Sequence, residues 1–101
     1  MPQNPFELFR QECPELAARF GDLVNAQRQS KGLDDKTRQL VCIAVNAANR
    51  NPIGVRMHAP MARKAGATRH DVIAAVMMNL HLSGLAAVLD SLPAAVEGYD
   101  A

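Results

Sequence analysis

Apolar residues recur along most of this chain at helical spacing, and the alternation typical of β-strands never persists. A short first helix is predicted over 5–12, because the Cys13-Pro14 step disfavours helical geometry at residue 13. A second helix is predicted over 14–29 and ends at Ser30-Lys31-Gly32. One face of this second helix carries Leu16, Phe20, Leu23, Val24 and Gln27.

The third predicted helix is the expected centre of the domain. Asp34 suits its N-cap, and Asp35 places negative charge in the first turn, where the helix dipole favours it. From Leu40 to Ala48 the sequence is apolar nearly all round, which is typical of a buried helix. A polar stripe nevertheless follows one side, either as a seam of hydrogen bonds or as one wall of a site; it comprises Gln39, Cys42, Asn46 and Asn49.

Two further helical segments have clear starts. Asn51-Pro52 predicts an N-cap followed by proline at the first helical position, for a helix that runs to about Ala65 and is kinked at Pro60. Gly66 is expected to stop it. Thr68 and Asp71 predict a cap for the next helix, over 69–82.

After a break at Ser83-Gly84, a last helix is predicted over 85–96, interrupted at Pro93 and followed by a frayed tail over 98–101. The expected fold is therefore all-α, in a single domain over 1–101. We expect a compact bundle of about five or six helices, arranged around the central buried helix 34–49 and an antiparallel helical pair.

Composition changes the picture in two ways. The chain has 101 residues and is 49% hydrophobic, yet only 4% aromatic and without tryptophan, so the core must use Ala, Leu, Val, Ile and Met. This apolar content exceeds what one small domain can bury, which favours a homo-oligomer.

A net charge of +1 without a basic block argues against nucleic acid as a partner. The chain has no signal pattern and no apolar run of about 18 residues, so neither secretion nor a membrane is expected, and the predicted location is the cytoplasm.

Candidate chemistry centres on one histidine. Arg56 and Arg63 are expected to face solvent, so His58, about 200° around the same helix from Arg56, should point inward. An inward histidine serves either as a general acid–base group or as a hydrogen-bonded core residue. Cys13 and Cys42 form no Cys-x-x-Cys pair, and the histidines match no zinc spacing, so neither a metal nor a cofactor is predicted.

Four segments together resemble a known family. Leu33–Leu40 reads LDDKTRQL, Ala44–Asn49 reads AVNAAN, His58 follows, and Ala65–Thr68 reads AGAT. In this order and spacing they resemble the carboxymuconolactone decarboxylase family, including its AhpD-like peroxidase branch. The resemblance covers about residues 15–95 and implies a helical homo-oligomer, commonly a trimer or a hexamer.

The resemblance also assigns expected positions for a site. Redox members carry a glutamate, a Cys-x-x-Cys pair and a histidine, which fall here on Gln39, on Asn51 and Gly54, and on His58. Only the histidine is retained, so the resemblance implies a divergent, non-redox member. We expect Asn51 to cap the amide of residue 53 or 54. Gly54 either leaves a hollow beside the imidazole or lets a neighbouring helix pack closely.

Three functions follow as hypotheses. The first is a decarboxylase-like lyase that performs acid–base chemistry, decarboxylation or isomerisation, on a small cyclic carboxylic acid. His58 would be its catalytic residue; the substrate would meet Gln39, Asn51, Gly54 and His81, with His81 or Arg56 holding the carboxylate. The second is a non-catalytic oligomeric binding module on the same scaffold. The third is an AhpD-like alkylhydroperoxidase that uses Cys42 or Cys13.

Overall fold

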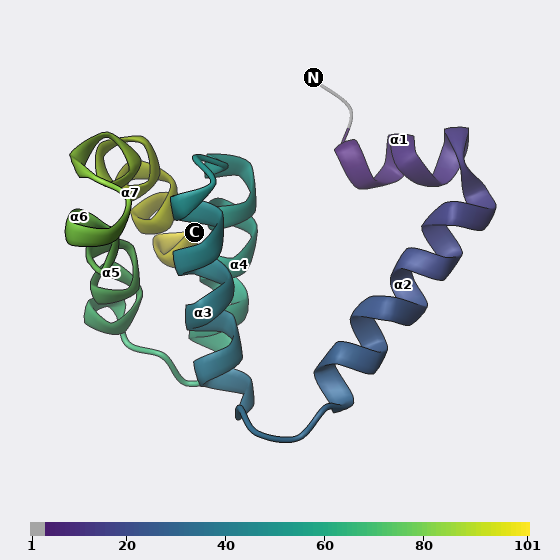
Figure 1. Ribbon diagram of the computed structural model, residues 1–101, viewed down its shortest axis with the longest axis horizontal. Coiled ribbons are helices and arrows are strands. Elements are labelled where there is room, and N and C mark those ends of the chain that lie inside the picture. Colours follow the sequence, from purple (N-terminus) through teal and green to yellow (C-terminus); the bar gives the residue numbers. More distant parts are fainter. Residues whose placement is uncertain (1–3) are drawn as a thin grey trace. The chain divides into compact units, whose positions relative to one another are not determined.

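A computed structural model describes residues 4–101, and all the regular secondary structure in that range is helical, which confirms the predicted fold class (Figure 1). The chain divides after Gly32 into two units, which are described separately; the expectation of a single domain stays a prediction. The helices are α1 (Pro5–Glu12), α2 (Pro14–Gln29), α3 (Asp35–Ala48), α4 (Pro52–Lys64), α5 (Arg69–Met77), α6 (Asn79–Leu82) and α7 (Leu85–Asp100).

The first unit is the hairpin of α1 and α2, whose bounds match the prediction. Asn4 caps α1, because its Oδ1 accepts a hydrogen bond from Phe6 N at 2.8 Å. The two helices meet through Phe9 and Phe20, whose rings pack edge to face with centroids 6.1 Å apart. Neither helix contains a buried residue, so the apolar face of α2 is largely left exposed by the hairpin itself.

The second unit begins with α3 and α4, which lie antiparallel. Asp34 caps α3 through a 2.7 Å bond from Thr37 N, as predicted. Side-chain bonds join Gln39 to His58 near one end of the pair and Asn46 to Asn51 near the other. Since the residue numbers rise along one helix as they fall along the other, the expected antiparallel pairing is confirmed for α3 and α4.

The helix predicted over 69–82 is two helices, because Met78 separates α5 from the single turn of α6. The predicted cap is present: Thr68 and Asp71 form a reciprocal capping box at the start of α5. The break coincides with Asn79, a buried residue whose Nδ2 donates to the carbonyl oxygens of Ala44 and Val76, each at 3.3 Å. This tertiary contact with α3 accounts for an interruption that helical periodicity does not reveal.

The C-terminal segment is helical to Asp100, so the predicted frayed tail and the predicted end near residue 96 are wrong. Pro93 lies within this helix. Side chains from elsewhere hold its last turn: Arg63 Nη1 donates to Tyr99 O at 2.9 Å, and Tyr99 Oη donates to Ala67 O at 2.9 Å. Satisfying a carbonyl of the last turn compensates for the bonds that a helix end lacks.

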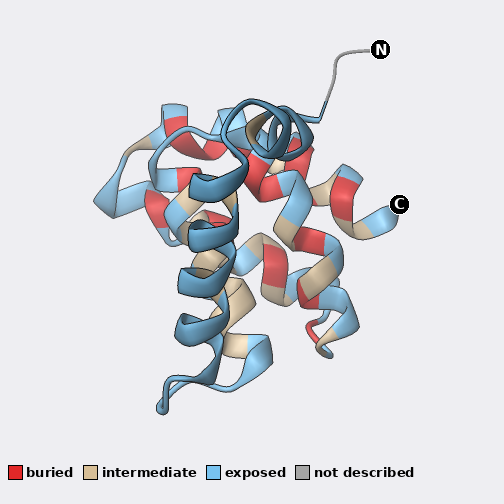
Figure 2. Ribbon diagram, turned by 90° about the vertical axis from the view of Figure 1, so that its right-hand side faces the viewer, coloured by how far each residue is buried: buried red, intermediate tan, exposed pale blue. Residues whose placement is uncertain are grey.

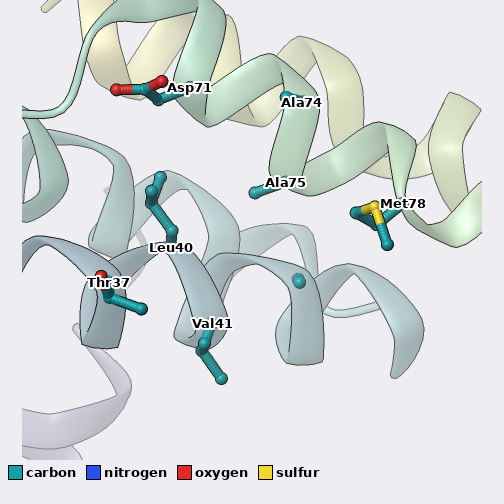
Figure 3. Close-up of a pocket in the computed structure, with 8 residues that line it drawn as sticks. Thr37, Leu40, Val41, Asp71, Ala74, Ala75 and Met78 are labelled. Atoms are coloured by element: carbon teal, nitrogen blue, oxygen red, sulfur yellow. The ribbon is translucent and has the colours of Figure 1, made fainter. Parts of the chain in front are cut away.

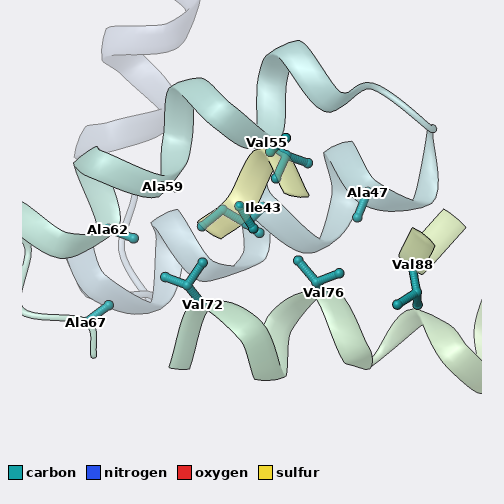
Figure 4. Close-up of a cluster of buried hydrophobic side chains, with 11 residues drawn as sticks. Ile43, Ala47, Val55, Ala59, Ala62, Ala67, Val72, Val76 and Val88 are labelled. Atoms are coloured by element: carbon teal, nitrogen blue, oxygen red, sulfur yellow. The ribbon is translucent and has the colours of Figure 1, made fainter. Parts of the chain in front are cut away.

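The core of the second unit consists of small side chains where α3, α4, α5 and α7 meet (Figure 4). The fully buried residues include Ile43, Ala47, Val55, Val72 and Val76. Buried and exposed positions alternate along the same helices (Figure 2). The expectation of a helix buried on all sides is wrong for α3, because Val41 and Val45 are 44% and 52% exposed. Only one face of α3 enters the core.

Candidate functional site

The candidate site is a hydrogen-bonded pair across α3 and α4. His58 Nδ1 lies 2.8 Å from Gln39 Oε1, and both residues are half-buried. Gln39 belongs to the second turn of α3, and His58 lies near the middle of α4. The structure thus brings together the predicted catalytic histidine and one of its four predicted companions.

The bond determines which nitrogen of the imidazole carries the proton. An amide oxygen can only accept, so with this orientation of Gln39 the proton of the bond belongs to His58 Nδ1. In the neutral ring, Nε2 is then the nitrogen that can take up a proton. Gln39 is uncharged at every pH, so it orients the ring without placing a carboxylate beside it.

The packing of α4 confirms the predicted direction of His58. Val55 and Ala62 are fully buried, whereas Arg56 and Arg63 are exposed. Arg56 Nη2 donates to Glu97 Oε2 at 2.7 Å and therefore reaches toward α7. Arg56 thus contacts α7 on one side of α4, whereas His58 contacts Gln39 on the side that faces α3.

Asn51 and Gly54 also meet, at the start of α4; they lie about two turns and one turn before His58. Asn51 Oδ1 accepts a bond from Gly54 N at 3.2 Å, which confirms the predicted cap, and Asn51 Nδ2 donates to Asn46 Oδ1 at 3.1 Å. A Cβ atom on the buried Gly54 would overlap the Asn46 side chain. Of the two alternatives for Gly54, the structure therefore has the close approach of a neighbouring helix. Contacts of Asn51 and Gly54 with a substrate stay predictions.

His81 lies apart from this pair. It is exposed on α6, and Asn79 in the same turn bonds to Ala44, five residues beyond Gln39 along α3. Five residues correspond to about 140° around a helix, so α6 contacts a different side of α3 from the one that carries Gln39. A role for His81 in substrate binding stays a prediction. Among residues 4–101, no three His, Cys, Asp or Glu side chains are placed to hold a metal ion.

A groove between α3 and α5 is the second feature, and the sequence did not indicate it. Its volume is about 350 Å³. The lining residues, drawn in Figure 3, are Thr37, Leu40, Val41, Ala44, Asp71, Ala74, Ala75 and Met78. On α3, the lining residues Thr37, Val41 and Ala44 lie roughly half a turn around the helix from Gln39. The groove and the Gln39–His58 pair therefore lie on different sides of α3.

Charge in the groove comes from Asp71, which the fold already uses. The Thr68 N–H donates to its carboxylate at 2.9 Å and holds the pKa of Asp71 below its ordinary value. Asp34 has a lowered pKa for the same reason, a hydrogen bond from the backbone N–H of Thr37. Both carboxylates take part in helix capping: Asp34 is the N-cap of α3, and Asp71 belongs to the capping box of α5.

The cysteines lie in different units. Cys13 is exposed at the junction of α1 and α2, Cys42 is half-buried on α3, and neither forms a disulfide within the described residues. No helix within residues 4–101 is long and apolar enough to cross a membrane.

Comparisons with known proteins agree with the resemblance. A sequence model of the carboxymuconolactone decarboxylase family matches residues 14–97. The fold is similar to the crystal structure of apo-lpg0406, a carboxymuconolactone decarboxylase family protein from Legionella pneumophila, with a TM-score of 0.79 and 29% identity. That match covers 93% of this chain and 83% of the other. No curated protein matches the sequence.

Proposed function

Because the chain belongs to the carboxymuconolactone decarboxylase family, we propose that it is a non-redox member that performs acid–base chemistry on a small cyclic carboxylic acid. The observation that carries the proposal is the 2.8 Å bond between Gln39 and His58. A half-buried imidazole with a fixed tautomer suits proton transfer at carbon, since its ordinary pKa lies near neutral pH.

The chemistry requires one proton-transfer group. In a decarboxylation, the bond between the ring carbon and the carboxylate breaks, its electron pair stays on that carbon, and carbon dioxide leaves. His58 in its protonated form then delivers a proton through Nε2 to the same carbon. In an isomerisation, neutral Nε2 instead takes a proton from carbon and returns it at another position. Gln39 keeps two amide N–H donors, which suit a carboxylate oxygen of the substrate.

The positions at which redox members carry thiols support the non-redox assignment. Here they are Asn51 and Gly54, and neither residue can form a thiolate. The Asn51 side chain also accepts a hydrogen bond from the Gly54 N–H, which would otherwise be available to bind an anion at the start of α4. Peroxide reduction through a Cys-x-x-Cys disulfide therefore has no equivalent at this site.

A second candidate function is a non-catalytic oligomeric binding module. It is favoured by exposed apolar side chains on α3, on α6 and at the junction of α5 with α6, among them Val41, Val45, Met78 and Leu82. Such side chains suit burial against further copies of the chain, and a homo-oligomer, a trimer or a hexamer, is proposed for either function. The binding-module function differs from the enzyme in predicting no turnover.

Turnover of a panel of cyclic carboxylic acids, followed by release of carbon dioxide and by isomer formation, tests the proposal. We expect the wild type to convert at least one member, and His58→Ala to lose roughly 10²–10⁴-fold in rate, the usual contribution of a general acid–base group. His70→Ala is the matched control, because His70 is exposed in the first turn of α5. Equal rates for His58→Ala and the wild type would exclude the proposed role of His58.

A further inference from the structure

We propose that Asn46 is a positioning residue for His58: it locks the start of α4 against α3 and so sets the separation at which Gln39 meets the imidazole. The inference rests on the proposed function of His58 for its catalytic meaning, but the geometry behind it is independent of any substrate. It also gives one physical role to the polar stripe along α3.

Gln39 and Asn46 lie on one face of α3. They are seven residues apart, close to two helical turns, so their side chains leave the helix in nearly the same direction. On α4 the partner positions Gly54 and His58 are four residues apart and likewise share a face. The two polar contacts therefore sit at the two ends of one stretch of the α3–α4 interface.

Both ends of the Asn46 amide are used. Its Nδ2 donates to Cys42 O at 2.8 Å, one turn back on α3, and its Oδ1 accepts from Asn51 Nδ2 at 3.1 Å. Donor and acceptor are thus both satisfied, which fixes the orientation of the amide. Asn51 carries the link onward, because its Oδ1 accepts from Gly54 N at 3.2 Å. We call this chain of bonds the Asn46–Asn51–Gly54 interlock.

Steric contact reinforces the interlock. The Asn46 side chain packs against the bare backbone of Gly54, where no Cβ atom fits. The main chain adds a 2.9 Å bond from Asn51 N to Asn46 O, and Arg50 between the helices has a left-handed φ of 54°. The start of α4 is therefore held at one distance and one rotation relative to α3.

This geometry has a direct consequence one turn later. A rigid α4 that is seated at Gly54 has little freedom to slide or turn at His58, because the two residues are only about 6 Å apart along the helix axis. The 2.8 Å bond to Gln39 exists only over a narrow range of donor–acceptor distances, so a shift of α4 by about 1 Å away from α3 would break it. The interlock thus acts on the tautomer of the imidazole through the position of the helix.

The ring nitrogens of His58 provide the test, by ¹⁵N–¹H NMR at a pH where the ring is neutral. We expect the Nδ1–H form to dominate in the wild type. In Asn46→Ala and in Asn51→Ser we expect Nδ1–H to lose its majority to Nε2–H, the form that an unconstrained histidine prefers. Serine at position 51 keeps a good N-cap but is too short to reach Asn46, so the second variant retains the start of α4.

Asn49→Ala is the matched control, because Asn49 is an exposed asparagine at the C-cap of α3, the helix that carries Asn46. We expect this variant to keep the wild-type tautomer of His58. Helix content by circular dichroism verifies that each variant is folded, and Asn51→Ser alone decides the matter if Asn46→Ala does not fold. An unchanged tautomer ratio in a folded Asn51→Ser protein would overturn the proposal. If the tautomer responds as expected but His58→Ala leaves turnover unaltered, the interlock stands and the proposed function fails.

Discussion

Gln39 on α3 accepts a hydrogen bond from His58 on α4, with 2.8 Å between Oε1 and Nδ1. The pair joins the two helices at half-buried positions and fixes the tautomer of the imidazole. A neutral amide does this without placing a charge beside the ring. The proposed proton transfer depends on this fixed orientation of the imidazole.

Replacing that amide by a carboxylate should change the titration of the ring. In Gln39→Glu, a negative charge within hydrogen-bond distance stabilises the imidazolium, so the pKa of His58 should lie higher than in the wild type. An NMR titration of the ring protons measures the difference, and the His70 ring serves as an internal control in the same spectra. Equal titration midpoints for His58 in the two proteins would show that the residues do not interact in solution.

Close packing of α7 on α4 should make Gly98 intolerant of a larger side chain. A Cβ atom there would lie 2.5 Å from Arg56 O and 3.0 Å from Ala59 Cβ, so Gly98→Ala should lower the free energy of unfolding by about 1–3 kcal/mol. Gly21→Ala on α2 is the control, because its added Cβ meets nothing within 4 Å. This variant should raise the free energy of unfolding by about 0.5–1 kcal/mol. Chemical denaturation measures both, and a gain in stability for Gly98→Ala would contradict the packing.

Ser91 carries a buried hydroxyl for which the described residues offer no hydrogen-bond partner. Burying an unsatisfied hydroxyl is unfavourable, so Ser91→Ala should raise the free energy of unfolding by about 1 kcal/mol. Ser83→Ala is the matched control, because that hydroxyl donates to Asn79 Oδ1 at 2.9 Å and its loss should cost about 0.5–1.5 kcal/mol. Thermal unfolding of the two variants should therefore move in opposite directions. A lower midpoint for Ser91→Ala would imply that the hydroxyl is satisfied in solution.

The caps predict a specific dependence of stability on pH. The pKa of Asp71 is lowered in the folded chain by the Thr68 N–H, so its charge stabilises the fold above the unfolded pKa, about 3.9. That contribution is lost as the pH falls through the lower, folded pKa. Asp71→Asn keeps an acceptor for the capping box but removes the negative charge. The variant should therefore be less stable than the wild type at pH 7, and this difference should shrink in strong acid. Urea unfolding at several pH values checks this, with Asp22→Asn on α2 as the control. If the difference in stability between Asp71→Asn and the wild type did not depend on pH, a stabilising role for the Asp71 charge would be ruled out.

Local signals predicted where helices begin but not where all of them end. Asp34, Asn51 and Thr68 cap helices as expected, because a cap involves residues only two or three positions apart. The break at Met78 and the ordered end of α7 depend instead on partners far along the chain, Ala44 for Asn79 and Arg63 for Tyr99. Helical periodicity carries no information about such contacts.

The site was predictable to a similar extent. The family resemblance selected Gln39 and His58, but their contact depends on how α4 packs on α3, which a single sequence does not specify. Asn46 was visible as part of a polar stripe, yet its bonds to Cys42 and Asn51 follow from the same packing. The groove between α3 and α5 is formed by residues from two helices of which neither alone shows a distinctive pattern.

The central claim is that His58 transfers a proton at a carbon atom of the substrate. Turnover of an accepted cyclic acid in D₂O, with the product examined by mass spectrometry and NMR, tests it most directly. The account predicts solvent deuterium at the reacting carbon with the wild type, and a loss of roughly 10²–10⁴-fold in the rate of that incorporation with His58→Gln. Deuterium incorporation by His58→Gln at the wild-type rate would contradict it.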